Sequence, residues 1–188
     1  MESIKLALRG VSPLLMQGDA LVDPLNEHRR AIREFTKKKA KTDSDMLEIA
    51  RLEWEAAMYF DVEAGPYMPG QNVDAMMRDA GRLTKRGKDI LRGAMCVDDK
   101  PPLIYDGPRD IAGLWADPRF QDRRSVVVQR ARTMRYRPIF RAWSLSLTIA
   151  YDEGIFDPAD LRTLLAAGGR YIGLGTYRPR FGRFEVTG

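Results

Sequence analysis

The chain has 188 residues, of which 31 are basic and 26 acidic, and its formal net charge is +5. Its 44% hydrophobic and 30% charged composition is that of a soluble globular protein, and its length suits one well-filled core, so we expect a single domain, 1–188. One cysteine and one histidine exclude an internal disulfide and an imidazole cluster, and they argue against a zinc site, Cys–His catalysis and a Ser–His–Asp triad.

The N-terminal residues predict a strand rather than a targeting segment. Ile4, Leu6 and Leu8 alternate with polar or small residues, which indicates a half-buried first strand that ends near Gly10. No apolar stretch approaches the roughly 20 residues of a membrane helix, and the N-terminus lacks a secretory apolar core. We therefore expect a cytoplasmic protein without membrane contact. The loop 14–24 follows, and its Asp19 and Asp23 fit ordinary turn chemistry.

An inserted helical hairpin is predicted over residues 25–59. Its first helix, 26–41, is basic, and its lysine run 37–39 is interpreted either as a solvated helix end or as a contact for a phosphate backbone. The second helix begins after the cluster 42–45, where Asp45 and Glu48 have the spacing of a capping box. Its apolar stripe at helical spacing is interpreted as a packing face and consists of Leu47, Ala50, Trp54, Ala57 and Met58.

The middle of the chain predicts short elements joined by Pro- and Gly-rich turns. Helices are expected over 72–80 and around 85–91, short strands over 94–97 and 103–105, and one helical turn over 109–115. Asp98 and Asp99 precede two prolines and have no third carboxylate nearby in sequence. They are therefore interpreted as a turn rather than a metal site, and no cofactor or metal is expected.

A basic strand and an amphipathic strand follow. The run 126–138 begins with three valines and is predicted as one strand. Four arginines lie along this strand: Arg130, Arg132, Arg135 and Arg137. Because side chains of a strand alternate between its two faces, the first two would point to one face and the last two to the other. A bulge near Thr133 would be required for all four to share one surface. Without a bulge, one pair of arginines must be ion-paired or exposed on the far face. The strand 143–151 alternates apolar residues with small polar ones, which predicts one buried face.

The C-terminal part predicts a helix, a glycine-rich loop and a last strand. Asp157 has the position of an N-cap for the helix 158–165, and Phe184 and Val186 belong to the final strand. Between them lie glycines, aromatic residues and arginines, with no carboxylate from Gly168 to Phe184. Amide groups, guanidinium groups and aromatic rings suit a phosphate backbone with unstacked bases. A Gly-rich turn with solvated arginines is the alternative.

Charge is segregated along the chain. The segment 123–141 holds seven arginines and the segment 169–183 holds four, both without an acidic residue. The rest of the chain holds the other 20 basic residues and all 26 acidic residues, so its formal net charge is −6. Such a distribution is typical of a surface for a polyanion, although an acidic protein would also satisfy it.

Two motifs resemble a known superfamily. The first motif combines the C-terminal helix with Gly-Leu-Gly at 173–175 and Phe-Gly-Arg-Phe at 181–184. It resembles the C-terminal glycine-rich loop of the repeat-associated mysterious proteins (RAMPs), the RNA-binding superfamily of CRISPR effector complexes. Gly-Pro-Tyr-Met-Pro-Gly at 65–70 resembles a segment of their backbone subunits. The next residues of those subunits are basic and end in glycine, whereas residues 71–75 here are Gln-Asn-Val-Asp-Ala, which departs from the family's phosphate contact.

The resemblance implies both a fold and a function. The fold would be α+β: a ferredoxin-like, RNA-recognition-motif-like antiparallel sheet with helices mainly on one face, the inserted hairpin and the C-terminal loop. The function would be sequence-independent binding of guide-like single-stranded RNA in antiviral defence, with head-to-tail self-association or other effector subunits as further partners. The residues expected to contact RNA are Arg130, Arg132, Arg135, Arg137, Arg170, Gly173, Gly175, Tyr177, Arg178, Arg180 and Arg183, with Phe181 as an alternative stacking ring.

Two alternatives remain at this stage. The fold could serve as a non-enzymatic protein-interaction module, such as a subunit mimic, an inhibitor of a CRISPR complex or a phage structural protein. The altered segment 71–75 and the inserted hairpin favour that interpretation. Some backbone subunits hold a target-cleaving aspartate in the region of loop 14–24, where Asp19 is the nearest candidate here. We nevertheless expect no catalytic residue, because turn chemistry accounts for Asp19.

Overall fold

The computed structural model describes residues 1–128 and 130–187 and divides the chain into two compact units. Unit 1 consists of Met1–Leu14, Phe60–Asp106 and Phe140–Gly188, and unit 2 of Leu15–Tyr59 and Gly107–Ile139. The expected helical insertion, 25–59, lies within unit 2 together with a second stretch of chain. The single domain expected over 1–188 stays a prediction. Among the described residues, no helix combines the length and the apolar character that a membrane crossing requires.

Unit 1 is built on an antiparallel sheet. Its strands are β1 (Glu2–Gly10), β5 (Ala94–Cys96), β6 (Leu103–Ile104), β9 (Ser144–Tyr151) and β10 (Phe184–Val186). The order is β10-β1-β9-β5, and β6 also pairs with β9. β1 pairs with β9 from Glu2↔Tyr151 to Arg9↔Ser144. The predicted alternation is confirmed, because Leu6 and Leu8 of β1 and Leu145 and Leu147 of β9 are buried.

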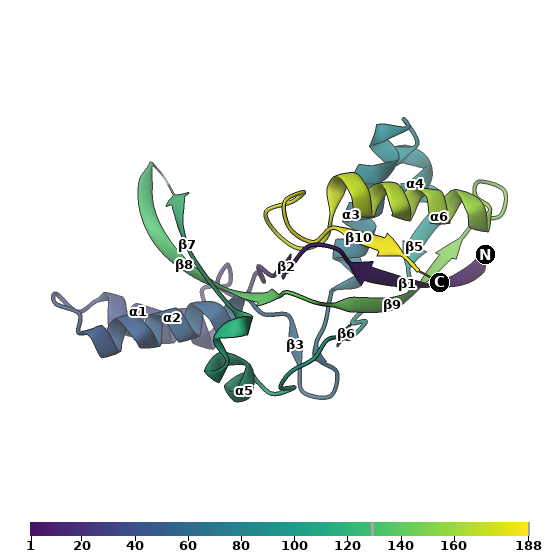
Figure 1. The fold of residues 1–188 in the computed structure, drawn as a ribbon. Coiled ribbons are helices and arrows are strands. Elements are labelled where there is room, and N and C mark those ends of the chain that lie inside the picture. The colour runs from purple at the N-terminus through teal and green to yellow at the C-terminus, as the bar shows by residue number, and fades with distance from the viewer. Residues whose placement is uncertain (129, 188) are drawn as a thin grey trace. The chain divides into compact units, whose positions relative to one another are not determined.

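Three helices of unit 1 lie on the same face of this sheet (Figure 1). They are α3 (Gly70–Leu83), α4 (Gly87–Gly93) and α6 (Pro158–Ala167), and α6 continues into the π-helical turn η2 (Gly168–Ile172). The predicted cap of α6 is confirmed, since the Asp157 side chain accepts a hydrogen bond from the Asp160 N–H. A short pair, β3 (Phe60–Asp61) and β4 (Gly65–Pro66), precedes α3. The unit therefore combines helices with an antiparallel sheet, as expected for an α+β protein.

Unit 2 combines a helical hairpin with a twisted strand pair (Figure 1). Its elements are α1 (Glu27–Thr36), α2 (Asp43–Ala57), α5 (Ile111–Ala116), the 3₁₀ turn η1 (Pro118–Phe120), β7 (Gln121–Val128) and β8 (Ala131–Phe140). The strand β2 (Leu14–Leu15) adds to β8, giving the order β2-β8-β7. Trp54 of α2 is fully buried and donates from Nε1 to the Phe120 carbonyl. This bond joins the helical hairpin to the segment that enters β7.

The expected single strand over 126–138 is wrong, because the chain reverses within it. β7 and β8 form a hairpin whose register runs without interruption from Gln121↔Pro138 to Val128↔Ala131. The register is continuous through Val126↔Thr133, so the bulge expected near Thr133 is absent. Arg130 lies in the turn with φ +69°, a left-handed conformation that long side chains seldom adopt. Gln129 lies outside the described residues.

Helix α2 begins earlier in its capping motif than expected. Thr42 is the N-cap: its hydroxyl accepts from the Asp45 N–H, and the Asp45 carboxylate accepts from the Thr42 N–H. The capping box is thus Thr42–Asp45 rather than Asp45–Glu48, and Glu48 pairs with Arg51 instead. The predicted packing stripe is confirmed at Ala50, Trp54, Ala57 and Met58, whereas Leu47 is 64% exposed.

Candidate nucleic-acid interface

The glycine-rich loop of unit 1 is closed by contacts that require glycine. The Leu174 N–H donates to the Gly182 carbonyl over 2.9 Å, and the Gly182 N–H donates to the Pro13 carbonyl over 2.8 Å. Gly173 and Gly182 have φ values of +82° and +74°, and a Cβ on Gly182 would lie 1.8 Å from the Leu174 carbonyl oxygen. The two arms of the loop therefore approach too closely for any side chain at Gly182. Gly175, between them, also has a positive φ, of +74°.

The first two glycines of the glycine-rich segment allow close packing and do not form a turn. Gly168 and Gly169 are buried in η2. A Cβ would lie 2.2 Å from the Met76 Sδ at Gly168 and 2.1 Å from the Phe184 carbonyl oxygen at Gly169. Helix α6 therefore runs on to Ile172 through η2, and the expected loop begins later than the sequence indicated, at Gly173.

Three of the four loop arginines are available to an anion. Arg170, Arg180 and Arg183 are exposed, and within the described chain none of them has a carboxylate partner. Arg170 and Arg183 line one hollow of about 540 Å³, whose Glu185 is already paired with Arg9. Their charges are therefore not neutralised by that carboxylate.

Arg178 differs from the other loop arginines. Its Nη2 lies 3.5 Å from the Asp79 carboxylate of α3, and Asp79 also pairs with Arg82 over 2.9 Å. A phosphate contact at Arg178 would therefore compete with a carboxylate. No local pattern in the sequence indicates this pair, because Asp79 lies about a hundred positions before Arg178.

The aromatic residues of the loop differ in exposure. Tyr171 and Tyr177 are 52% and 41% exposed, and both line a second hollow, of about 470 Å³, beside Gly175. Tyr177 has φ +56°, an outlier for a bulky residue and of a kind that gathers at functional sites. The Arg170 guanidinium lies 5.2 Å from the centre of the Tyr171 ring. Phe181 is only 8% exposed, so the structure contradicts the alternative that its ring stacks on a base.

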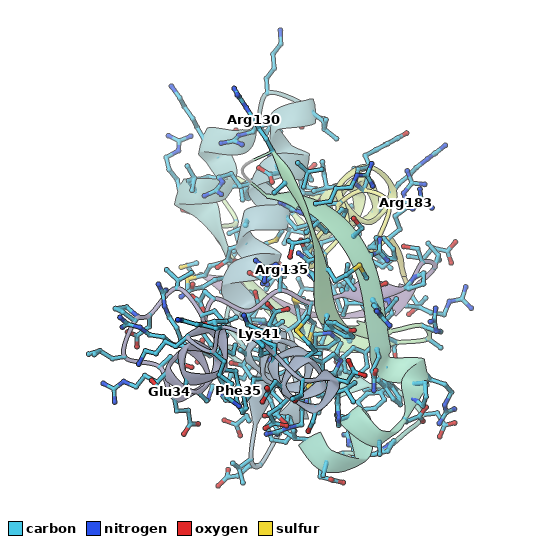
Figure 2. All side chains as sticks on the ribbon, turned by 90° about the vertical axis from the view of Figure 1, so that its left-hand side faces the viewer. Glu34, Phe35, Lys41, Arg130, Arg135 and Arg183 are labelled. Carbon is cyan, nitrogen blue, oxygen red and sulfur yellow. The ribbon has the colours of Figure 1, made fainter. Side chains whose placement is uncertain are left out.

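The β7–β8 hairpin of unit 2 presents its arginines unequally (Figure 2). Arg130 projects from the turn and Arg132 is exposed, and within residues 1–128 and 130–187 neither has a carboxylate partner. Arg135 instead donates to the half-buried Glu53 of α2, and Arg137 donates to the Gln17 side chain. Without a bulge, one pair of arginines was expected to be ion-paired or exposed, and one member of such a pair, Arg135, is ion-paired.

Glu53 is held in an unusual electrostatic environment. Burial raises the pKa of its carboxyl, while the Arg135 and Arg137 guanidinium groups and the Tyr136 N–H oppose that rise. Arg135 therefore neutralises a carboxylate that is costly to keep charged, so it is poorly suited to leave for a phosphate. Sequence reasoning missed Glu53, which lies 82 positions before its partner.

The expected arginines belong to different units. Arg170, Arg178, Arg180 and Arg183 lie in unit 1, whereas the four arginines of β8 and its turn lie in unit 2. Each set is assembled within its own unit. A single track formed by both sets stays a prediction.

The acidic candidates occupy turns. Asp19 is exposed and its carbonyl accepts from the Val22 N–H, while the Asp23 carboxylate accepts from the Leu25 N–H. The Asp98 carboxylate accepts from the Thr148 N–H, as a structural turn residue would. Among the described residues, no group of three or more His, Cys, Asp or Glu side chains could hold a metal ion.

Comparison with known proteins finds no matching family model and no matching curated protein. Among solved structures, the chain is similar to one in the cryo-EM structure of the type III-B Cmr-beta complex bound to cognate target RNA. The identity is 12% and the TM-score 0.48, with 99% of this chain covered. This chain spans 58% of the length of that chain, and the likeness is loose.

Proposed function

We propose that this protein binds single-stranded RNA without sequence preference through the glycine-rich loop of unit 1, assisted by Arg130 and Arg132 of unit 2. The observation that carries the proposal is the set of exposed loop arginines, Arg170, Arg180 and Arg183, which lack carboxylate partners within the described chain. Guanidinium groups on a loop with positive-φ glycines suit phosphates. Tyr171 and Tyr177 would offer rings to unstacked bases.

The loop rather than the sheet is the proposed contact surface. On the face of the sheet away from the helices, β1 presents Ser3, Lys5, Ala7 and Arg9, paired with Ala150, Thr148, Ser146 and Ser144 of β9. RNA-recognition motifs stack bases on aromatic residues of their sheet. These two central strands present small and charged side chains there instead, so base stacking by the sheet is not part of the proposal.

The proposed fold type follows from the order of elements in unit 1. β1, α3, β5, β9, α6 and β10 occur in this order, with other elements between some of them, and the spatial strand order is β10-β1-β9-β5. This order supports a ferredoxin-like β-α-β-β-α-β fold as our proposal. We extend the proposal to a RAMP-like subunit of a CRISPR effector that holds a guide-like RNA. Its partners would then include further effector subunits or copies of the chain itself.

The test is RNA affinity measured across salt concentrations. Fluorescence anisotropy with a labelled 15-nucleotide oligo(U) should give a steep salt dependence. The slope in question is that of the logarithm of the association constant against the logarithm of the salt concentration. The triple variant Arg170→Ala, Arg180→Ala and Arg183→Ala should reduce the magnitude of this slope by about 2, at ~0.7 per lost phosphate contact on a single strand. The matched control is Arg51→Ala, Arg92→Ala and Arg119→Ala, which removes the same charge from arginines whose carboxylate partners have no contact with the loop arginines within the described chain. Equal slopes for the two triple variants would refute the loop as the binding site.

A protein-interaction module is the second candidate. The start of α3 favours it, because Asp74 stands where backbone subunits of the family have a basic segment, and its carboxylate accepts from the Cys96 N–H. Nucleic acid that co-purifies with the recombinant protein, seen as a raised 260-to-280 nm absorbance ratio, would support RNA binding. Its absence, together with weak oligo(U) binding, would favour the second candidate.

Cleavage of RNA at Asp19 ranks last among the candidates. Asp19 is exposed in a turn, and the resemblance alone points to it. Regularly spaced cleavage of a target RNA that disappears in Asp19→Ala would establish it. Intact RNA after prolonged incubation with the unchanged protein would exclude it under those conditions.

A further inference from the structure

Unit 2 contains a groove between α2 and the β7–β8 hairpin that is separate from the glycine-rich loop. Its volume is about 720 Å³. Met46, Leu47 and Met134 line it and are 55%, 64% and 41% exposed. Further along α2, Ala50 and Trp54 are buried, so the apolar side of the helix is left open only over its first two turns. Exposed methionines are common on surfaces that accept other chains.

The rim of this groove carries a positive charge. Lys41, Arg123 and Arg132 line it, and none of the three has a carboxylate partner within the described chain. Arg123 lies 5.5 Å from the centre of the Tyr136 ring, and Lys41 directly precedes Thr42, the N-cap of α2.

The carboxylates at the groove do not cancel these cations. Glu53 is paired with Arg135. Asp43 lies in the first turn of α2, where the helix dipole stabilises a negative charge. Three cations of the rim thus face one ionised carboxylate, Asp43, so an incoming acidic group would still meet a net positive charge.

The wall formed by β8 presents an open strand edge. The Tyr136 N–H donates to the Glu53 carboxylate and therefore points away from β7. Because N–H groups alternate along a strand, those of Arg132 and Met134 point to the same side. β2 adds to β8 only near Pro138, where the Met16 N–H donates to the Pro138 carbonyl. Within the described residues, no strand pairs with this side of β8 over 131–135.

We propose that this groove binds an acidic protein segment in extended conformation, which adds a strand to the open edge of β8. Its backbone pairs with β8 near Arg132 and Met134, its apolar side chains pack on Met46 and Leu47, and its carboxylates reach Lys41 and Arg123. Strand addition of this kind takes affinity from main-chain hydrogen bonds and specificity from alternate side chains. RNA suits the groove less well, because its backbone has no N–H groups to donate to the carbonyl oxygens of the open strand edge.

The probe is a fluorescein-labelled ten-residue peptide in which Glu alternates with Val, titrated with the full chain by anisotropy. Arg123→Glu should weaken binding about tenfold or more, because it places a repulsive carboxylate at the rim. Arg30→Glu makes the same charge change on α1 of the same unit, at an exposed residue that does not line the groove, and should leave the affinity within about twofold. N-methylation of alternate peptide amides should abolish binding, because it removes the donors that pair with β8.

Several results would overturn the proposal. They are no binding to the unchanged protein, equal losses in Arg123→Glu and Arg30→Glu, undiminished binding of the N-methylated peptide, and equal binding of a peptide that alternates Lys with Val. Oligo(U) binding that Arg123→Glu abolishes, without peptide binding, would assign the groove to nucleic acid and also overturn it. Circular dichroism and urea midpoints identify variants that fail to fold, and Leu47→Ser then serves as a second groove variant. Because all groove variants lie in unit 2, the result is independent of the loop variants.

Discussion

Arginines a few positions apart on β8 have different electrostatic tasks. Arg132 is exposed and open to a ligand, whereas Arg135 neutralises the half-buried Glu53. A phosphate that recruited Arg135 would leave Glu53 charged and unpaired, which opposes binding. Four arginines in β8 and its turn were predicted from the sequence to contact RNA. Of these, we therefore expect Arg130 and Arg132 to affect RNA binding most.

Removing Arg135 should destabilise the protein in a pH-dependent way. Arg135→Met leaves the Glu53 carboxylate without its ion partner and should cost about 2 kcal/mol at pH 7.5, below the range for fully buried pairs because Arg135 is partly exposed. Burial already raises the pKa of Glu53, and loss of Arg135 should raise it further. Because a raised pKa lets the buried carboxyl take up a proton more readily on acidification, the stability loss should be smaller at pH 5 than at pH 7.5. Urea midpoints at both pH values measure this.

The control for that experiment is Arg9→Met. Arg9 pairs with Glu185 on the surface, where both side chains are more than half exposed, and such pairs contribute at most about 1 kcal/mol. Its effect should be small and nearly independent of pH between 5 and 7.5. A loss for Arg135→Met that is constant across this range would contradict the role assigned to Glu53.

Gly182 should be the least replaceable glycine of the loop. Gly182→Ala combines a φ of +74° with a Cβ placed 1.8 Å from the Leu174 carbonyl oxygen, so the loop must open. We expect a loss of about 2–4 kcal/mol, more than positive φ alone would cost. Gly154→Ala, in an exposed turn where the Cβ would lie 3.2 Å from one Asp152 oxygen, is the control. Similar urea midpoints for the two variants would refute the closed loop.

The sequence predicted which loop residues are unusual but not which are available. Positive φ at Gly173, Gly175 and Gly182 follows from local chemistry that glycine reveals. The burial of Phe181 and the pairing of Arg178 with Asp79 depend on contacts from elsewhere in the chain. No local pattern carries that information, which is why the sequence retained Phe181 as an alternative stacking ring.

Helices and strands were predictable where a regular spacing of apolar residues or a capping residue indicates them. The alternation of β1 and β9 and the Asp157 cap of α6 are local signals, and all three are confirmed. The β7–β8 hairpin was missed because its turn contains Arg130 rather than the glycine or asparagine that ordinarily marks a two-residue turn. The uncovered first turns of α2 were missed because a periodic stripe indicates an apolar side without showing what covers it.

The capping box of α2 gives a test at the scale of one element. Thr42→Ala removes the hydroxyl that accepts from the Asp45 N–H and should cost about 1 kcal/mol. Ser44→Ala, at an exposed position next to the box, should change stability by less than about 0.5 kcal/mol. Thermal unfolding measures both variants. A Thr42→Ala protein as stable as Ser44→Ala would show that the cap does not limit the stability of α2.

At the scale of the whole molecule, the elements should differ widely in local stability. α1 has no buried residue, whereas β1 and β9 pair over eight positions at the centre of their sheet. Hydrogen exchange followed by mass spectrometry should therefore show amides of α1 exchanging at least about 100-fold faster than those of β1 and β9, because sparsely packed elements open locally. Comparable protection of α1 and β1 would contradict this ranking.

The pairing of β1 also constrains how the protein is made. β1 leaves the ribosome before its partners β9 and β10, which begin at residues 144 and 184. At about 5–20 residues per second, the first strand waits on the order of ten seconds or longer for its last partner. During synthesis its apolar side chains, Leu6 and Leu8, have no sheet to enter. We therefore expect rapid elongation, or a chaperone that covers this strand, to lower aggregation of the nascent chain.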